Sequence, residues 1–167
     1  MVHECGHVLG AWFTGGTVKQ VVLHPLTLSR TDLAQNPHPL IVVWAGPMFG
    51  VLAPLALWGI AAALRLAGTF VLRFFAGFCL IANGAYIAVG SLERIGDCGE
   101  MLRHGSQMWH LWLFGAIVTP LGFWLWHRQG TEFGLGSANG VVDLRLAYVM
   151  LAVALVTVVV GLVVGRL

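Results

Sequence analysis

Charged side chains are scarce in this chain. Asp, Glu, Lys and Arg make up 10% of its 167 residues, whereas an ordinary soluble domain carries about a quarter. Hydrophobic residues make up 58%, so a soluble fold of this size would lack the charges to cover its surface. The composition excludes an ordinary soluble protein and predicts an integral membrane protein whose main partner is the lipid bilayer.

Positive charge and cysteine are also in short supply. The formal net charge is only +2 and no basic run occurs, so we expect no nucleic-acid partner. The three cysteines are an odd number at unrelated spacings, which argues against a disulfide framework. The sequence also lacks internal repeats and any linker long enough to divide it. We therefore expect a single domain over residues 1–167.

Long apolar segments, in contrast, are plentiful, and they cover residues 40–66, 69–89, 109–126 and 144–164. A helix needs about 20 apolar residues to cross the bilayer core. Within lipid, the backbone N–H and C=O groups must form hydrogen bonds inside the protein, as they do in a helix. The segments predict four transmembrane helices, of which the last two, counted with their flanking residues, cover 109–127 and 144–165. Lys and Arg divide five against four between the two sides, which leaves the orientation open.

A shorter apolar stretch over residues 2–14 ends at Gly15-Gly16 and predicts a short first helix. The next stretch, VKQVVLHPLTLSRTDL (18–33), mixes Val, Thr and Leu with polar residues around His24-Pro25, which predicts a small β-hairpin. The predicted fold is an all-α polytopic membrane protein: a short first helix, a β-hairpin and four transmembrane helices. Tracing the spans places the charged segment 90–108 on the same side as the hairpin.

The first helix contains His3-Glu4-Cys5-Gly6-His7, which has the H-E-x-x-H spacing of zinc hydrolases. Residues three and four apart share a helix face, so His3 and His7 project together, with Glu4 beside them and Cys5 on the opposite face. Two such imidazoles can bind Zn²⁺, and the carboxylate can take a proton from a zinc-bound water. The alternative is a frayed, solvated N-terminus in which these side chains have no chemical role.

A catalytic zinc usually takes three protein ligands, and Asp97 is the best-placed candidate for the third. It lies in IGDCGEML, just beyond the second full span. Two roles are open for it: a zinc ligand, or the N-cap of a helix through Leu102 with Glu100 completing a capping box. The other candidates have more ordinary explanations. His24 and His38 are typical of surface or turn residues, and His110 and His127 flank a membrane helix, where histidine is typical of an interfacial anchor.

These motifs resemble those of the site-2 protease family of membrane-embedded zinc metallopeptidases. HECGH (3–7) with its small-residue tail is similar to the family's HExGH helix, WAGP (44–47) resembles its Gly-Pro motif, and GDCG (96–99) resembles its Asp-Gly motif. The resemblance covers residues 1–104, which would form the metallopeptidase-like core. It implies that His3, His7 and Asp97 bind Zn²⁺ and that Glu4 is the catalytic base.

The sequence also departs from the family pattern. Gly50 stands three residues after Pro47, where the family usually has Asn, and Asn83 lies 14 residues before Asp97 with no Pro between them. Asn83 is predicted to be either a substrate-binding amide or a hydrogen bonder between helices. The family's histidines lie well inside a helix, so we expect the first helix to begin upstream of Met1, and inactivity through such a truncation stays open as an alternative.

The resemblance implies a zinc metalloendopeptidase of the cell membrane that hydrolyses a membrane protein or peptide substrate at or within the bilayer. The substrate would unwind and pair with the hairpin edge at 18–30. The alternative is a catalytically inactive, metal-binding membrane scaffold of the same family. A channel or transporter would need polar groups along several spans, whereas Asn83 is almost the only uncharged amide within one.

Overall fold

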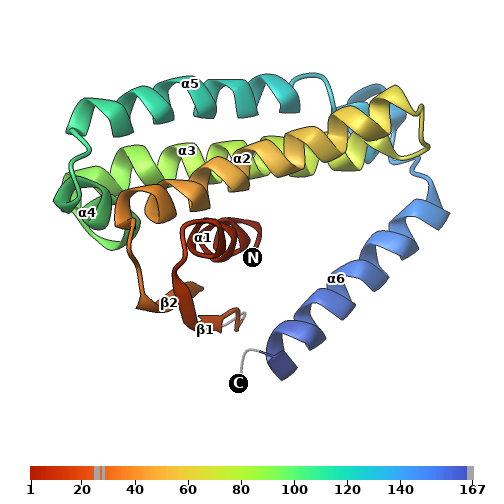
Figure 1. Ribbon diagram of the computed structural model, residues 1–167. Coiled ribbons are helices and arrows are strands. Elements are labelled where there is room, and N and C mark those ends of the chain that lie inside the picture. The colour runs from red at the N-terminus through yellow and green to blue at the C-terminus, as the bar shows by residue number, and fades with distance from the viewer. Residues whose placement is uncertain (25–26, 28, 165–167) are drawn as a thin grey trace.

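The computed structural model describes residues 1–24, 27 and 29–164 of the chain. Figure 1 shows a helical bundle with a small hairpin at one end and one long helix that extends away from it. The elements, in order, are α1 (Val2–Phe13), β1 (Thr17–Val22), β2 (Arg30–Gln35), α2 (Pro39–Ala63), α3 (Thr69–Glu93), α4 (Gly96–Arg103), α5 (Met108–Trp126), two short 3₁₀ turns (Gly130–Phe133 and Gly136–Ala138) and α6 (Leu144–Val164). The predicted fold class is confirmed.

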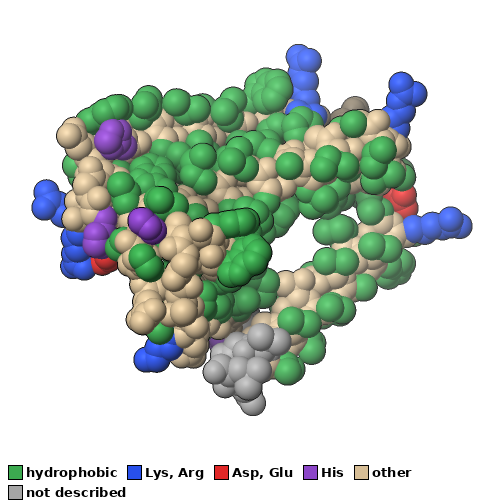
Figure 2. Space-filling model, viewed as in Figure 1, with side chains coloured by type: hydrophobic (Ala, Val, Ile, Leu, Met, Phe, Trp, Pro, Cys, Tyr) green, Lys and Arg blue, Asp and Glu red, His purple; other side chains and the backbone are tan. Residues whose placement is uncertain are grey.

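Four helices in the described part of the chain are long and apolar enough to cross a membrane: Pro39–Ala63, Thr69–Glu93, Met108–Trp126 and Leu144–Val163. Figure 2 shows apolar side chains over much of the visible flanks of the molecule, with Lys and Arg side chains at its periphery. Such a surface suits lipid, because a helix satisfies its own backbone groups and its apolar side chains need no water. The chain is therefore compatible with a multi-pass membrane protein.

Two helix boundaries differ from those expected from hydropathy. The helix α2 ends at Ala63 rather than near residue 66, because Arg65 takes a positive φ of 53° that turns the chain. The helix α3 continues to Glu93, four residues past the expected end at 89. Hydropathy marks where the apolar residues stop, whereas the backbone hydrogen bonds of α3 continue into the polar residues that follow.

The hairpin has antiparallel strands with Val22 opposite Arg30 and Thr17 opposite Gln35. Its second strand therefore begins where the expected edge at 18–30 ended, and it runs to Gln35. The predicted turn residue Pro25 lies outside the described residues. Before the hairpin, α1 ends at Phe13 and Gly15 adopts a φ of +74°, which an L side chain rarely takes. The glycine break predicted at 15–16 is confirmed.

Close helix packing builds the bundle around α3, which lies between α2 and α5 (Figure 1). A Cβ added at Gly115 of α5 would lie 2.8 Å from the carbonyl oxygen of Gly84 in α3, so the two backbones touch directly. Small residues allow this approach between membrane helices. An apolar cluster under α4 fixes that short helix to the bundle, and it comprises Val43, Ile87, Cys98, Met101 and Leu111. This packing sets α4 at the hairpin end, as predicted.

Candidate metal centre

The helix α1 directs two histidines to one place. His3 and His7 are one turn apart, and their Nε2 atoms lie 3.0 Å from each other, with the rings at a T-shaped angle. The i, i+4 spacing produces this arrangement, because side chains four residues apart lie one above the other on a helix. His7 is buried and His3 is half-buried. The two imidazoles thus face a common point rather than solvent.

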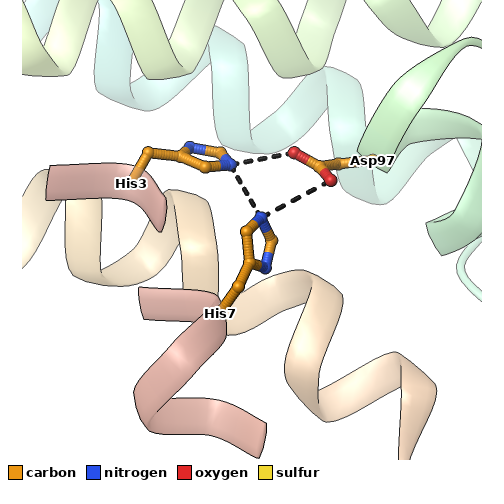
Figure 3. A group of neighbouring side chains, drawn as sticks. All are labelled: His3, His7 and Asp97. Atoms are coloured by element: carbon orange, nitrogen blue, oxygen red, sulfur yellow. Dashed lines mark hydrogen bonds and ion pairs between the residues drawn. The ribbon is translucent and has the colours of Figure 1, made fainter. Parts of the chain in front are cut away.

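Asp97 completes the cluster from α4 (Figure 3). Its Oδ2 lies 2.8 Å from His3 Nε2 and its Oδ1 lies 3.5 Å from His7 Nε2. The N-cap alternative for Asp97 is wrong, because α4 begins at Gly96 with Ile95 at the N-cap position. Glu100 does not form the expected capping box either; its carboxylate pairs with Arg103 and His104 on the surface. The first turn of α4 therefore presents Asp97 to the histidines.

Each histidine is held through its other ring nitrogen. His7 Nδ1 donates to the carbonyl oxygen of Val42 at 2.9 Å. His3 Nδ1 donates to Asn83 Oδ1 at 2.7 Å, and the amide of Asn83 is oriented by its own donation from Nδ2 to the Cys79 carbonyl. A neutral imidazole protonated at Nδ1 has its lone pair on Nε2. Without a metal, a proton on Nε2 is what either ring can donate to Asp97; once that proton leaves, the Nε2 lone pair can bind a metal.

The contacts of Asn83 bear on its two predicted roles. Its bond to His3 joins α3 to α1, so it is a hydrogen bonder between helices. It also fills the space beside Gly50, where an added Cβ would lie 2.7 Å from Asn83 Oδ1. The amide is buried, and both of its ends have partners within the protein. Its role in substrate binding stays a prediction.

The Gly-Pro segment of α2 contributes space rather than a polar group. A Cβ at Gly46 would collide with the ring of His7 and would lie 2.8 Å from His3 Nε2. On the facing helix, a Cβ at Gly6 would collide with the carbonyl of Ala45. The absence of side chains at these two positions allows α1 to lie directly on α2. The histidine pair depends on this close approach.

The donor set fits a zinc ion. Bonds of about 2.0–2.2 Å at tetrahedral angles place zinc ligands about 3.3 Å apart, and the two Nε2 atoms lie 3.0 Å from each other. Asp97 lies 2.8 Å from His3 Nε2 through Oδ2 and 3.5 Å from His7 Nε2 through Oδ1, and one ligand atom from each residue lies within 4.8 Å of the others. Two imidazoles and one carboxylate are a ligand set that catalytic zinc uses. The side chains of His3 and Asp97 are 18% and 25% exposed, so the cluster is open on one side, where a fourth ligand could enter.

The electrostatics of the cluster favour a charged carboxylate. Burial alone would raise the pKa of Asp97, but hydrogen bonds from His3 and His7 hold it well below its usual range. Burial likewise acts to lower the pKa of His7, and the hydrogen bond and charge of Asp97 outweigh it, so the pKa of His7 is raised. Asp97 is thus an anion across the physiological range, as a metal ligand must be.

Glu4, the predicted base, is buried beside these ligands. Its Oε2 accepts a hydrogen bond of 2.8 Å from the hydroxyl of Thr31, which stands on β2. No pattern in the sequence indicated Thr31, because its contact depends on how the hairpin folds back on α1. The hairpin therefore contacts Glu4, the residue next to His3 in the chain, through Thr31.

Tyr86 is a second residue that the sequence did not indicate. Its hydroxyl accepts from the backbone N–H of Asp97 at 3.2 Å, and its ring meets that of His3 edge-on at 5.9 Å. It thereby satisfies one of the free N–H groups of the first turn of α4. The sequence offers one indication of this contact: Tyr86 lies near the end of an apolar segment, close to the charged segment that contains Asp97.

The remaining histidines and cysteines do not join the cluster. Within the described ranges, His3, His7 and Asp97 are the one group of three side chains placed to hold a metal. His110 accepts from the backbone at the start of α5. Cys5 is exposed and outside the cluster, as predicted. Burial raises the pKa of the Cys98 thiol to about 11, which suits a core residue.

Comparison with known proteins gave no assignment. No protein-family model, no curated protein and no solved structure matches this chain. The resemblance to the site-2 protease family rests on the motifs alone.

Proposed function

We propose that this chain is a zinc metalloendopeptidase of the site-2 protease type, embedded in the cell membrane. The observation that supports it best is the convergence of His3, His7 and Asp97. His3 and Asp97 are 94 residues apart in sequence, and Nε2 of His3 lies 2.8 Å from Oδ2 of Asp97. Two of the four helices long enough to cross a membrane, α2 and α3, contact the helices that carry this cluster. A buried cluster of ionisable groups in such a protein is by default a hypothesis for a functional site.

The residues divide the chemistry between them. Zinc, when bound by His3, His7 and Asp97, would acidify water and polarise a peptide carbonyl. Glu4 accepts the proton of the attacking water and then passes it to the leaving amine, as a general base and acid. Asn83 and the Val42 carbonyl keep the two imidazoles in the tautomer that the metal requires.

The proposed substrate class rests on the surroundings of the site. A peptide bond within a helix resists attack, so the substrate, a membrane protein or peptide, would be bound as an extended strand. Among the described residues the hairpin is two-stranded, and each strand has one edge without a strand partner there. Pairing with such an edge would give the backbone of the substrate its hydrogen bonds.

The test compares the wild-type chain with Glu4→Gln. Both proteins should hold about one zinc per chain by metal analysis in detergent. Wild type should cleave members of a panel of single-span peptides reconstituted in vesicles, with products identified by mass spectrometry, and Glu4→Gln should slow this by at least about a hundredfold. Equal cleavage by the two proteins would contradict the assignment of Glu4. Zinc without any cleavage would favour the inactive scaffold.

A further inference from the structure

Glu4 has a single hydrogen-bond partner among the described residues. The residue is 6% exposed, and the hydroxyl of Thr31 donates to its Oε2 at 2.8 Å. A buried carboxylate with few partners keeps its orientation only where those partners hold it. The bond uses one oxygen and leaves Oε1 available to accept a proton. The side-chain position of Glu4 therefore depends on Thr31.

The hydroxyl of Thr31 is itself placed by the hairpin. Thr31 is the second residue of β2 and pairs with Val21 of β1. Its neighbour in the ladder, Val22, is buried, and both strands contact α1. A β-branched side chain has restricted rotation about χ1, so the backbone of β2 sets where the hydroxyl lies. A displacement of β2 would move the hydroxyl away from Glu4.

We propose that Thr31 is a positioning residue for Glu4, through which the β-hairpin sets the orientation of the catalytic base. The catalytic role of Glu4 in this inference rests on the proposed function. The mechanical coupling of β2 to Glu4 stands on the geometry alone. Thr31 touches neither the metal ligands nor the reacting atoms in this assignment. Its loss should slow the chemical step without weakening substrate binding.

The kinetic test uses Thr31→Val, which keeps the shape and removes the hydroxyl, and Thr31→Ser, which restores the hydroxyl. Thr31→Val should lower kcat by about tenfold to a hundredfold, the size expected for a misplaced catalytic group, with KM and the zinc content unchanged. Thr31→Ser should recover most of the rate. The matched control is Thr17→Val, an exposed threonine at the other end of the same hairpin, which should behave as wild type.

A second measurement does not need activity. Hydrogen–deuterium exchange of residues 30–35 is compared in metal-free wild type, Glu4→Ala, Thr31→Val and the double variant. Each single change should speed exchange severalfold, and the double variant should add nothing further, because one bond is lost in all three. If wild type proves unable to cleave peptides, the proposed function fails, and this measurement alone decides the coupling.

Four results would overturn the inference. An unchanged kcat in Thr31→Val would show that the hydroxyl is not needed. A raised KM with normal kcat would assign Thr31 to substrate contact instead. Equal losses in Thr31→Ser and Thr31→Val would remove the hydroxyl as the cause. Unchanged exchange over residues 30–35 in both single variants would show that Glu4 and β2 are not coupled.

Discussion

The two ends of the bundle differ in what stabilises their side chains. The site end, made of α1, the hairpin, α4 and the adjoining parts of α2 and α3, buries polar side chains, and these take partners from other elements, as His3 does with Asn83 and Asp97. The far end leads into α6, which is apolar over its length and largely exposed. Figure 1 shows α6 leaving the bundle.

The difference has a physical basis. An apolar helix is stable in lipid without any specific neighbour, because it satisfies its own backbone. A buried histidine or carboxylate is stable only where particular atoms meet it. Substitutions at the site end should therefore act through specific geometry, and matched substitutions at the far end should change little. Substitutions at one position from each end therefore test the difference.

The largest effect is expected at His7. Changing His7→Ala removes one of the three proposed ligands and the turn-to-turn pair with His3, so the zinc content should fall from about one ion per chain to near zero. Metal analysis of the purified protein measures it. The far-end control is His127→Ala, an exposed histidine at the end of α5, which should keep its zinc. Full occupancy in His7→Ala would rule out the site.

A smaller, graded loss is expected at Asp97 and Asn83. Asp97→Ala removes a proposed ligand, whereas Asn83→Ala leaves the proposed ligands in place and removes the acceptor that orients His3. Loss of such an outer partner typically weakens metal affinity about 10–100-fold, and Asp97→Ala should exceed this. Affinities come from titration against a chelator of known strength.

The carboxylate control for Asp97 is Asp143→Ala. Asp143 accepts from the backbone N–H groups of Arg145 and Leu146 at the start of α6, so its loss should cost about 1 kcal/mol of helix capping and leave zinc affinity unchanged. A stronger effect of Asn83→Ala than of Asp97→Ala would mean that Asp97 is not the third ligand.

The same contrast explains how much the sequence predicted. Apolar runs and H-E-x-x-H spacing are local patterns, and they correctly placed the four long helices and the convergence of His3 and His7. The approach of Asp97 needed the topology as well, since α4 reaches the histidines only because the charged segment lies at the hairpin end. Thr31 and Tyr86 could not be predicted. Their contacts depend on the rotation of the hairpin and of α3 about their own axes, which no local pattern records.

The smallest effect is expected from Gly46→Ala, which adds one methyl group to α2 beside the cluster. Gly46→Ala would press a Cβ against His7 and His3; the rings can turn away, but only by leaving the positions that a metal requires, so zinc affinity should fall by about tenfold while the protein still folds. Gly59→Ala adds the same methyl where nothing lies within 4 Å, and alanine favours a helix over glycine. Its zinc affinity should equal that of wild type.

Because both changes are the same substitution in the same helix, a difference between them in the chelator titration isolates the contact with the histidines. Equal affinities would mean that the close approach of α2 to α1 does not set the metal geometry.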